Sequence, residues 1–571
     1  EKPQQEPVAA TAEKPKYGGT LTIRDAVEPT SGDSAASRQM LGGLTQWYVF
    51  EQLLDPDWLK GPAGTGEYDF RNWSSPDAMM GPTLAESVVK PSPDVWILKI
   101  RQGMHYQPVD SEAGRLMGGR EVTTDDIVWN YERMIHGPDT AISVLQPRVA
   151  AAMKVEKTGP WEITMTTPVQ PITAQWWVIE GGGYAVLHPR QVVEKYGNVS
   201  NWRNAVGTGP FMLIDYVPGS QVLYKRNPNY WGKDPLGTGK GNQLPYIDTL
   251  RRLIIPDTST FLAAVRTGKI DMTPGLSIDD TEQLSKTAPR IQHDEYLPTG
   301  FGTNGINFNL ADPKKPWADL RVRQALMYAT DFNAFVNGYY KGKAELDMVL
   351  VDPNFTGKGY KPLSTMSESV QSLFKYNPEK AKQLLKDAGY PTGFKADMLV
   401  PTAAALVDQM AIIKDMWSKV GVDLNIVQKE TAVLTGIVTR TFDWTDMFYG
   451  AAGGSVGSFG FSVYTYVGYY RGDNRLQFAS RTDPNGKPDP FIEGKFAEME
   501  KNIYVNWPAA YKAIEELRPY LIENAFKIPL PQPYLSTFWW PWMKNTYGQG
   551  PNVELLKYYW IDQDLKKSMG F

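Results

Sequence analysis

Cysteine is absent from this chain of 571 residues, and histidine is scarce. Without cysteine there is no disulfide bond, no thiolate nucleophile, no zinc–cysteine site and no iron–sulfur cluster within the chain. The four histidines stand at positions 105, 136, 188 and 293, too far apart for a local metal motif such as H-E-x-x-H. We therefore expect neither a metal site nor a cofactor.

Long apolar runs and a charge excess are also missing. No run approaches the roughly 18 apolar residues of a membrane-spanning helix. Lysine and arginine number 59 against 63 aspartates and glutamates, so the formal net charge is only −4. That balance provides no basic surface for nucleic acid and no basic run for acidic lipid. The length indicates two or three structural units of an ordinary soluble protein.

Aromatic residues are what the chain has in quantity. They make up 12% of it, with 18 tryptophans and 30 tyrosines. Large cores and packed seams between domains would account for such a number. A cleft that stacks its ligand on aromatic rings would account for it as well. Composition leaves both interpretations open.

Residues 1–16, with the sequence EKPQQEPVAATAEKPK, cannot bury enough apolar surface to order themselves. We expect a disordered tether, with a segment added for expression as the alternative. Beyond it, short β-like runs alternate irregularly with amphipathic helices, which predicts an α/β or α+β protein of several lobes. The strand candidates are residues 95–100, 161–166, 211–216, 222–225, 250–255 and 422–427, and the helix candidates are residues 123–135, 258–268, 316–330 and 377–389.

One enzyme motif requires consideration, the G-x-S-x-G pattern of residues 453–457, centred on Ser455. In a nucleophile elbow a helix follows the serine, and an aspartate and then a histidine come later in the chain. Here the following residues lack helical periodicity, and the last histidine, His293, precedes Ser455. A serine hydrolase is therefore the less favoured alternative, and we expect no catalysis.

Several segments in a fixed order resemble the family-5 extracellular solute-binding proteins, which include dipeptide, oligopeptide and nickel receptors. The resemblance runs from about residue 17 to residue 542. Its segments are residues 17–21 (YGGTL), 49–54 (VFEQLL), 96–103 (WILKIRQG), 122–127 (VTTDDI), 207–211 (GTGPF), 227–231 (NPNYW), 265–271 (VRTGKID), 307–309 (NFN), 319–328 (DLRVRQALMY) and 376–389.

The resemblance implies a two-lobed α/β fold of the periplasmic-binding-protein type II class, with an extra subdomain and a ligand enclosed between the lobes. We expect a discontinuous lobe I of residues 17–50, 205–258 and 525–571, an inserted subdomain of residues 51–204 and a lobe II of residues 259–524.

It also implies a monomeric receptor outside the cytoplasm, periplasmic or on the cell surface, that delivers its ligand to the membrane subunits of an ABC permease. Lipid anchoring through a residue preceding the tether is part of this expectation. A surface adhesion protein without a buried pocket is a further alternative.

The ligand class stays open between a peptide and a short oligosaccharide. In peptide-binding relatives, an aspartate after a Phe-Asp strand holds the amino terminus of the peptide. In those relatives a tryptophan precedes this aspartate by three positions. In this chain Tyr449 stands at the place of the tryptophan and Ala452 at the place of the aspartate. A buried ammonium would lose a charge-assisted hydrogen bond worth about 1.5–3 kcal/mol. We therefore do not expect the usual recognition of a free peptide amino terminus, and the neutral aromatic loop that follows also suits sugar faces.

The candidate ligand-binding residues combine aromatic platforms with small polar groups. An asparagine both donates and accepts hydrogen bonds, as peptide backbone and sugar hydroxyls require. Of two neighbouring tryptophans on a strand, one should face the core. For Phe459, packing within lobe II is the alternative role. The candidates are Met40, Trp176, Trp177, Asn307, Tyr449, Ser455 and Phe459.

Overall fold

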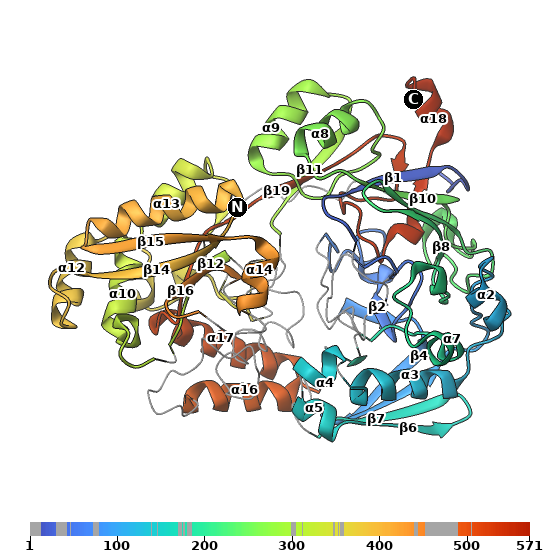
Figure 1. Cartoon of the computed structure of the whole chain (residues 1–571), viewed down its shortest axis with the longest axis horizontal. Helices are drawn as coiled ribbons and strands as arrows, with labels where there is room; N and C mark the ends of the chain where they lie inside the picture. The colour runs from blue at the N-terminus through green and yellow to red at the C-terminus, as the bar shows by residue number, and fades with distance from the viewer. Residues whose placement is uncertain are drawn as a thin grey trace. The chain divides into compact units, whose positions relative to one another are not determined.

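A computed structural model of the chain shows an α/β protein with two compact units (Figure 1). Unit 1 comprises Glu1–Tyr296 and Leu535–Phe571, and unit 2 comprises Leu297–Tyr534. The structure describes residues 13–29, 33, 43–45, 47–71, 79–138, 140–145, 147–168, 174, 178–179, 185–298, 304–310, 312–346, 349–351, 353, 359–438, 444–451, 489–503 and 505–571.

The first sheet of unit 1 joins strands that are far apart in the sequence. Its order is β1 (Thr20–Asp25), β10 (Thr249–Ile254), β9 (Gln221–Arg226) and β8 (Phe211–Val217). β1 runs parallel to β10, and the other pairs are antiparallel. Apolar side chains alternate along these strands, as a sheet with one buried face requires, which confirms the predicted strands in this region.

A second, antiparallel sheet of unit 1 has the order β4 (Ala85–Ser92), β5 (Val95–Ile100), β7 (Glu162–Thr166) and β6 (Lys154–Gly159). Helix α3 (Thr124–His136) contacts β6 and β7. The predicted capping box is present. The Thr123 hydroxyl accepts from the Asp126 N–H at 3.3 Å, and the Asp126 carboxylate accepts from the Thr123 N–H at 2.9 Å.

The boundary between the units differs from the prediction, which placed it at residue 259. Residues 259–296 belong to unit 1, because they bond to its sheets. The Asp271 N–H donates to the Thr22 carbonyl at 2.9 Å, and β11 (Gln292–Tyr296) pairs antiparallel with β19 (Leu535–Trp539). α8 (Thr258–Arg266) and α9 (Ile278–Thr287) lie in the same stretch.

The return boundary also differs, since the prediction began the last part of lobe I at residue 525. β17 (Lys527–Pro529) pairs antiparallel with β12 (Asn304–Phe308) of unit 2, with Ile528 opposite Ile306. Residues 525–534 therefore belong to unit 2. In β11 and β19, Tyr296 lies opposite Leu535, so the chain enters and leaves unit 2 from neighbouring positions of one ribbon.

The central sheet of unit 2 has the order β15 (Val422–Lys429), β14 (Phe394–Pro401), β16 (Met447–Ala451), β12 and β17. β14 is parallel to both β15 and β16, whereas β12 is antiparallel to β16 and β17. Helix α13 (Ala404–Ser418) connects β14 to β15 and packs on both.

Helices of unit 2 follow the signals read from the sequence. In α12 (Pro378–Asp387), Asn377 caps the first turn by accepting from the Lys380 N–H at 3.0 Å, and Gly389 takes a left-handed φ of 94° just beyond the end. The prediction of a helix there is confirmed. α10 (Leu320–Ala329) packs on α12, and α16 (Pro490–Asn502) packs on α17 (Trp507–Glu523).

The remaining elements of the described residues are short. They are β2 (Leu54–Pro56), η1 (Trp58–Lys60), β3 (Met80–Pro82), α2 (Glu112–Met117), α4 (Ala141–Leu145), α5 (Pro147–Ala152), α7 (Arg190–Tyr196), η4 (Trp202–Asn204), η5 (Gly237–Gly239), η6 (Pro316–Ala318), η7 (Ala334–Tyr339), β13 (Ala344–Glu345), η9 (Leu363–Thr365), α11 (Glu368–Ser372), α14 (Thr431–Gly436), β18 (Gln532–Pro533), β20 (Met543–Lys544), η12 (Leu556–Tyr558), β21 (Trp560–Ile561) and α18 (Gln563–Ser568).

The end of the predicted tether is attached to unit 1. Lys16 Nζ lies 2.9 Å from a carboxylate oxygen of Asp562 and 2.9 Å from one of Asp564. Glu13 pairs with Lys544 at 3.2 Å. Of the predicted tether, the structure describes residues 13–16, which ion pairs with Asp562, Asp564 and Lys544 hold on unit 1.

Candidate functional site

Two of the predicted ligand-binding residues, Asn307 and Tyr449, lie on adjacent strands of the unit 2 sheet. The register places Tyr449 opposite Ile306 and Asn307 opposite Phe448. Directly opposed residues share a face and consecutive residues alternate, so Asn307 and Tyr449 point to opposite faces of the sheet. A single ligand could reach both side chains only around the edge or the end of the sheet.

Tyr449 is packed against α13. Its side chain is 1% exposed, and its hydroxyl donates to Oε1 of Gln409 at 2.5 Å. Burial raises the pKa of the Tyr449 phenol, and the neighbouring Tyr340 and Tyr339 add to that shift. The phenol is therefore neutral and acts as a hydrogen-bond donor inside the unit.

Asn307 shares its face of the sheet with a buried lysine that the sequence analysis missed. Lys527 lies directly opposite Asn307 on β17 and is 3% exposed. Burial lowers the pKa of the Lys527 ammonium to about 7. A lysine within an apolar strand, between Phe526 and Ile528, was the available signal, because such a position faces the interior on one side or the other.

The acidic residue nearest to the strand of Tyr449 is already bonded within unit 2. Asp446 Oδ1 pairs with Lys315 Nζ at 2.5 Å, and Oδ2 accepts from the Asp397 N–H at 2.9 Å. Asn309 Nδ2 donates to the Trp444 carbonyl at 2.8 Å and holds the same segment. Asp446 therefore supports the sheet. It does not take the role of the peptide-binding aspartate for which the resemblance gives Ala452 in this chain.

In unit 1, Asp33, Arg133 and His188 form an ionic cluster in which Asp33 and His188 are fully buried. Arg133 Nη2 donates to Asp33 Oδ2 at 2.8 Å, and Arg133 Nη1 donates to His188 Nδ1 at 3.0 Å. Burial lowers the pKa of His188 to about 4. Although burial opposes its ionisation, the adjacent His188 and Arg133 hold the pKa of Asp33 at about 2.

A second buried polar cluster of unit 1 centres on Glu51. Its carboxylate accepts from the Tyr230 hydroxyl at 3.0 Å and from the Trp231 indole at 3.1 Å. Burial raises the pKa of Glu51 to about 7. Nearby, Lys557 pairs with Asp55 at 3.4 Å, with both side chains buried. These contacts fasten the segment after residue 50 to the C-terminal part of unit 1.

The other predicted ligand-binding residues, Met40, Trp176, Trp177, Ser455 and Phe459, lie outside the described residues, as does the G-x-S-x-G motif. Their roles stay predictions. Within the described ranges, no three histidine, aspartate or glutamate side chains are grouped as metal ligands would be. None of the helices the structure describes has both the length and the apolar character that crossing a bilayer requires.

Comparison with curated proteins finds relatives among binding proteins. Heme-binding protein A of Haemophilus influenzae is 33% identical over 233 residues, which cover 40% of this chain and 38% of that protein. The dipeptide-binding protein of Escherichia coli is 26% identical over 421 residues, which cover 70% of this chain and 67% of that protein.

Solved structures share the fold. The periplasmic binding protein DppA of Helicobacter pylori, an ABC transporter-associated protein in complex with the peptide STSA, matches with a TM-score of 0.69 at 18% identity. The match covers 96% of this chain and 99% of that one. The predicted fold class is confirmed.

One known family has a sequence model that matches most of the chain. The model of bacterial extracellular solute-binding proteins, family 5 (Middle), matches residues 80–475, which include the second sheet of unit 1 and most of unit 2. This chain belongs to the family-5 bacterial extracellular solute-binding proteins.

Proposed function

We propose that this protein is the extracytoplasmic receptor of an ABC importer, and that the solute it captures and delivers unaltered is a peptide. The family match over residues 80–475 carries the proposal. The similarity to a dipeptide-binding protein over 70% of the chain supports a peptide as the solute. An oligosaccharide, the other solute class that the sequence leaves open, has no such support among these relatives.

The capture mechanism in this proposal is a change in the arrangement of the two units. The chain crosses between them at neighbouring residues, Tyr296 and Leu535, so a rotation about this ribbon leaves the sheets of both units intact. A peptide shifts the balance of arrangements only through contacts that one arrangement makes better than the other. Delivery to a permease, the monomeric state and a lipid anchor before the tether belong to the same proposal.

Recognition of the peptide in this proposal does not use a carboxylate at position 452. Ala452 stands there, and Asp446 is already bonded to Lys315 and to the Asp397 backbone. Peptide backbone and side chains, rather than a free ammonium, would then supply the binding energy. The proposed contacts are Met40, Trp176, Trp177, Asn307, Tyr449, Ser455 and Phe459.

A thermal-shift screen tests the proposal. Peptides of graded length, neutral oligosaccharides and hemin are added to the purified full chain. A ligand that binds only the folded protein raises the free energy of unfolding, by about 2.7 kcal/mol when its concentration is one hundred times its Kd. The melting temperature rises as a result. We expect a shift with peptides, of similar size for free and N-acetylated forms. A shift with oligosaccharides or hemin alone would contradict the proposal.

A parallel assay addresses catalysis. Peptides and esters incubated with the protein should be recovered unchanged, since the proposal assigns no nucleophilic role to Ser455. A product that forms with the wild type and not with Ser455→Ala would contradict the receptor function and indicate a serine hydrolase.

A further inference from the structure

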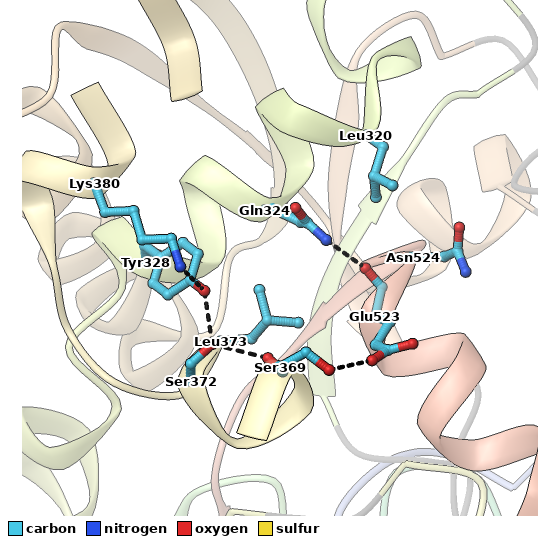
Figure 2. A pocket seen from close by; sticks show the side chains of 9 residues that line it. All are labelled: Leu320, Gln324, Tyr328, Ser369, Ser372, Leu373, Lys380, Glu523 and Asn524. Atoms are coloured by element: carbon cyan, nitrogen blue, oxygen red, sulfur yellow. Dashed lines mark hydrogen bonds between the residues drawn. The ribbon is translucent and has the colours of Figure 1, made fainter. Parts of the chain in front are cut away.

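A pocket lies within unit 2, among the ends of four helices (Figure 2). Its volume is about 390 Å³, near the lower end of the range of small-molecule sites. The side chains that line it come from α10, α11, α12 and α17 and from the residues next to them. They are Leu320, Gln324, Tyr328, Ser369, Ser372, Leu373, Lys380, Glu523 and Asn524.

The pocket contains one positive and one negative side chain. Figure 2 shows Lys380 and Glu523 at opposite sides of the lining residues, with Leu373 between them. Neither one forms an ion pair with any residue in the part of the chain that the structure describes. Two opposite charges that share a hollow without meeting each other are suited to a ligand that carries both charges.

Hydrogen bonds hold the Lys380 side chain in place. Its Nζ donates to the Tyr328 hydroxyl at 2.6 Å and lies 4.1 Å from the centre of the Tyr328 ring. The same hydroxyl bonds to the Ser372 hydroxyl at 2.7 Å. An ammonium has three N–H donors, so Lys380 retains donors for a ligand carboxylate.

Glu523 is held in a comparable way. Its Oε1 accepts from the Ser369 hydroxyl at 2.5 Å, and its backbone carbonyl accepts from Gln324 Nε2 at 2.9 Å. No described side chain bonds to its second carboxylate oxygen. That oxygen can accept from a ligand ammonium.

The helix dipoles favour the same ligand charges as the two side chains do. Lys380 is in the first turn of α12, where the helix dipole favours an anion, and Glu523 ends α17, where the dipole favours a cation. Two apolar side chains also line the pocket, Leu320, which is 37% exposed, and Leu373, which is 2% exposed. They provide an apolar surface for a small side chain.

We infer that this pocket binds an amino-acid-sized zwitterion with an apolar side chain. Lys380 would receive its carboxylate, Glu523 its ammonium, and Leu320 and Leu373 its side chain. The site is separate from the predicted solute contacts of the proposed function, because none of its lining residues is among them.

Equilibrium dialysis of radiolabelled L-leucine against the full chain tests the inference. We expect the wild type to bind one equivalent of leucine. Lys380→Gln and Glu523→Gln should each weaken that binding roughly tenfold to one hundredfold. Both replacements retain a hydrogen-bonding side chain of similar length. L-leucinamide and N-acetyl-L-leucine, which each lack one charge, should compete at least about tenfold less well than leucine.

Lys386→Gln is the matched control, because Lys386 lies on the same helix α12 and does not line the pocket. It should bind leucine as the wild type does. The inference is overturned if the wild type binds no leucine, if the pocket variants bind as much as the wild type, or if the two analogues compete equally well. Peptide-induced thermal shifts should persist in the pocket variants, so a failure here is distinct from a failure of the proposed function.

Discussion

The carboxylate of Asp271 accepts a hydrogen bond from the indole Nε1 of Trp542 at 2.8 Å, across 271 positions of sequence. The same Oδ1 pairs with Lys566 at 2.7 Å, and Oδ2 accepts from the Thr22 N–H at 2.7 Å. Asp271 is 1% exposed. This one side chain therefore fastens the first strand, the segment after α8 and the C-terminal segment of unit 1 together.

Asp271→Ala should strongly destabilise unit 1. The substitution leaves the buried Thr22 N–H and the Trp542 indole without an acceptor, and a buried donor left unpaired costs about 1–3 kcal/mol. We expect the free energy of unfolding to fall by about 2–4 kcal/mol, measured by urea unfolding followed by tryptophan fluorescence.

Asp110→Ala is the control for this measurement, since Asp110 pairs with Arg115 on the surface and should contribute little. Equal effects of the two substitutions would show that Asp271 does not hold these segments together.

His188 should make the protein less stable in mild acid. Its pKa in the folded protein is about 4, against an ordinary value of 6.5, because burial disfavours the charged ring. Between these two values the unfolded chain binds a proton that the folded protein does not, so stability falls as the pH falls from about 6.5 to about 4.

The pH dependence of the melting temperature, compared between the wild type and His188→Asn, measures this effect. The variant lacks the titrating ring, so its decline over this interval should be shallower, by an amount on the order of 3 kcal/mol in free energy at most. Two parallel curves would contradict the assignment to His188.

Glu51 should act with the opposite sign. Burial raises its pKa to about 7 from the ordinary 4.5, so the folded protein holds a proton that the unfolded chain releases. The stabilisation is complete below about pH 4.5 and is lost as the pH rises through about 7. Glu51→Gln remains neutral throughout, and we expect the stability of the wild type relative to this variant to decrease between about pH 4.5 and about pH 7, the interval between the two pKa values. A constant difference in melting temperature would argue against a buried, protonated Glu51.

Tyr449→Phe isolates the hydroxyl that contacts α13. The variant keeps the aromatic ring but leaves Oε1 of the buried Gln409 without its donor, a loss of about 1–2 kcal/mol. We expect a lower melting temperature for the ligand-free protein. Peptide affinity, measured by isothermal titration calorimetry, should change little, because the variant keeps the ring proposed to contact the peptide and the hydroxyl is already bonded to Gln409. A large loss of affinity with unchanged stability would place the hydroxyl on the ligand instead.

Local features of the fold could be predicted from the sequence because they depend on a few neighbouring residues. The Thr123–Asp126 capping box and the Asn377 cap with Gly389 beyond the helix are examples. The boundary at residue 297 could not, because it depends on contacts such as Asp271 with Trp542, whose partners no local pattern identifies.

The candidate site shows the same division. Residue types at positions 307 and 449 could be interpreted as ligand contacts, but which face of the sheet each one points to is set by the pairing of β12 with β16. Lys527 was missed for a related reason. Its burial follows from its position opposite Asn307, which requires β17 to pair with β12 over a separation that sequence spacing does not reveal.

Native mass spectrometry of the protein purified from rich medium tests the central claim most directly. The account predicts a one-to-one complex that releases an intact peptide when the protein is unfolded. Release of an oligosaccharide, of hemin or of a cleaved product in place of an intact peptide would contradict it.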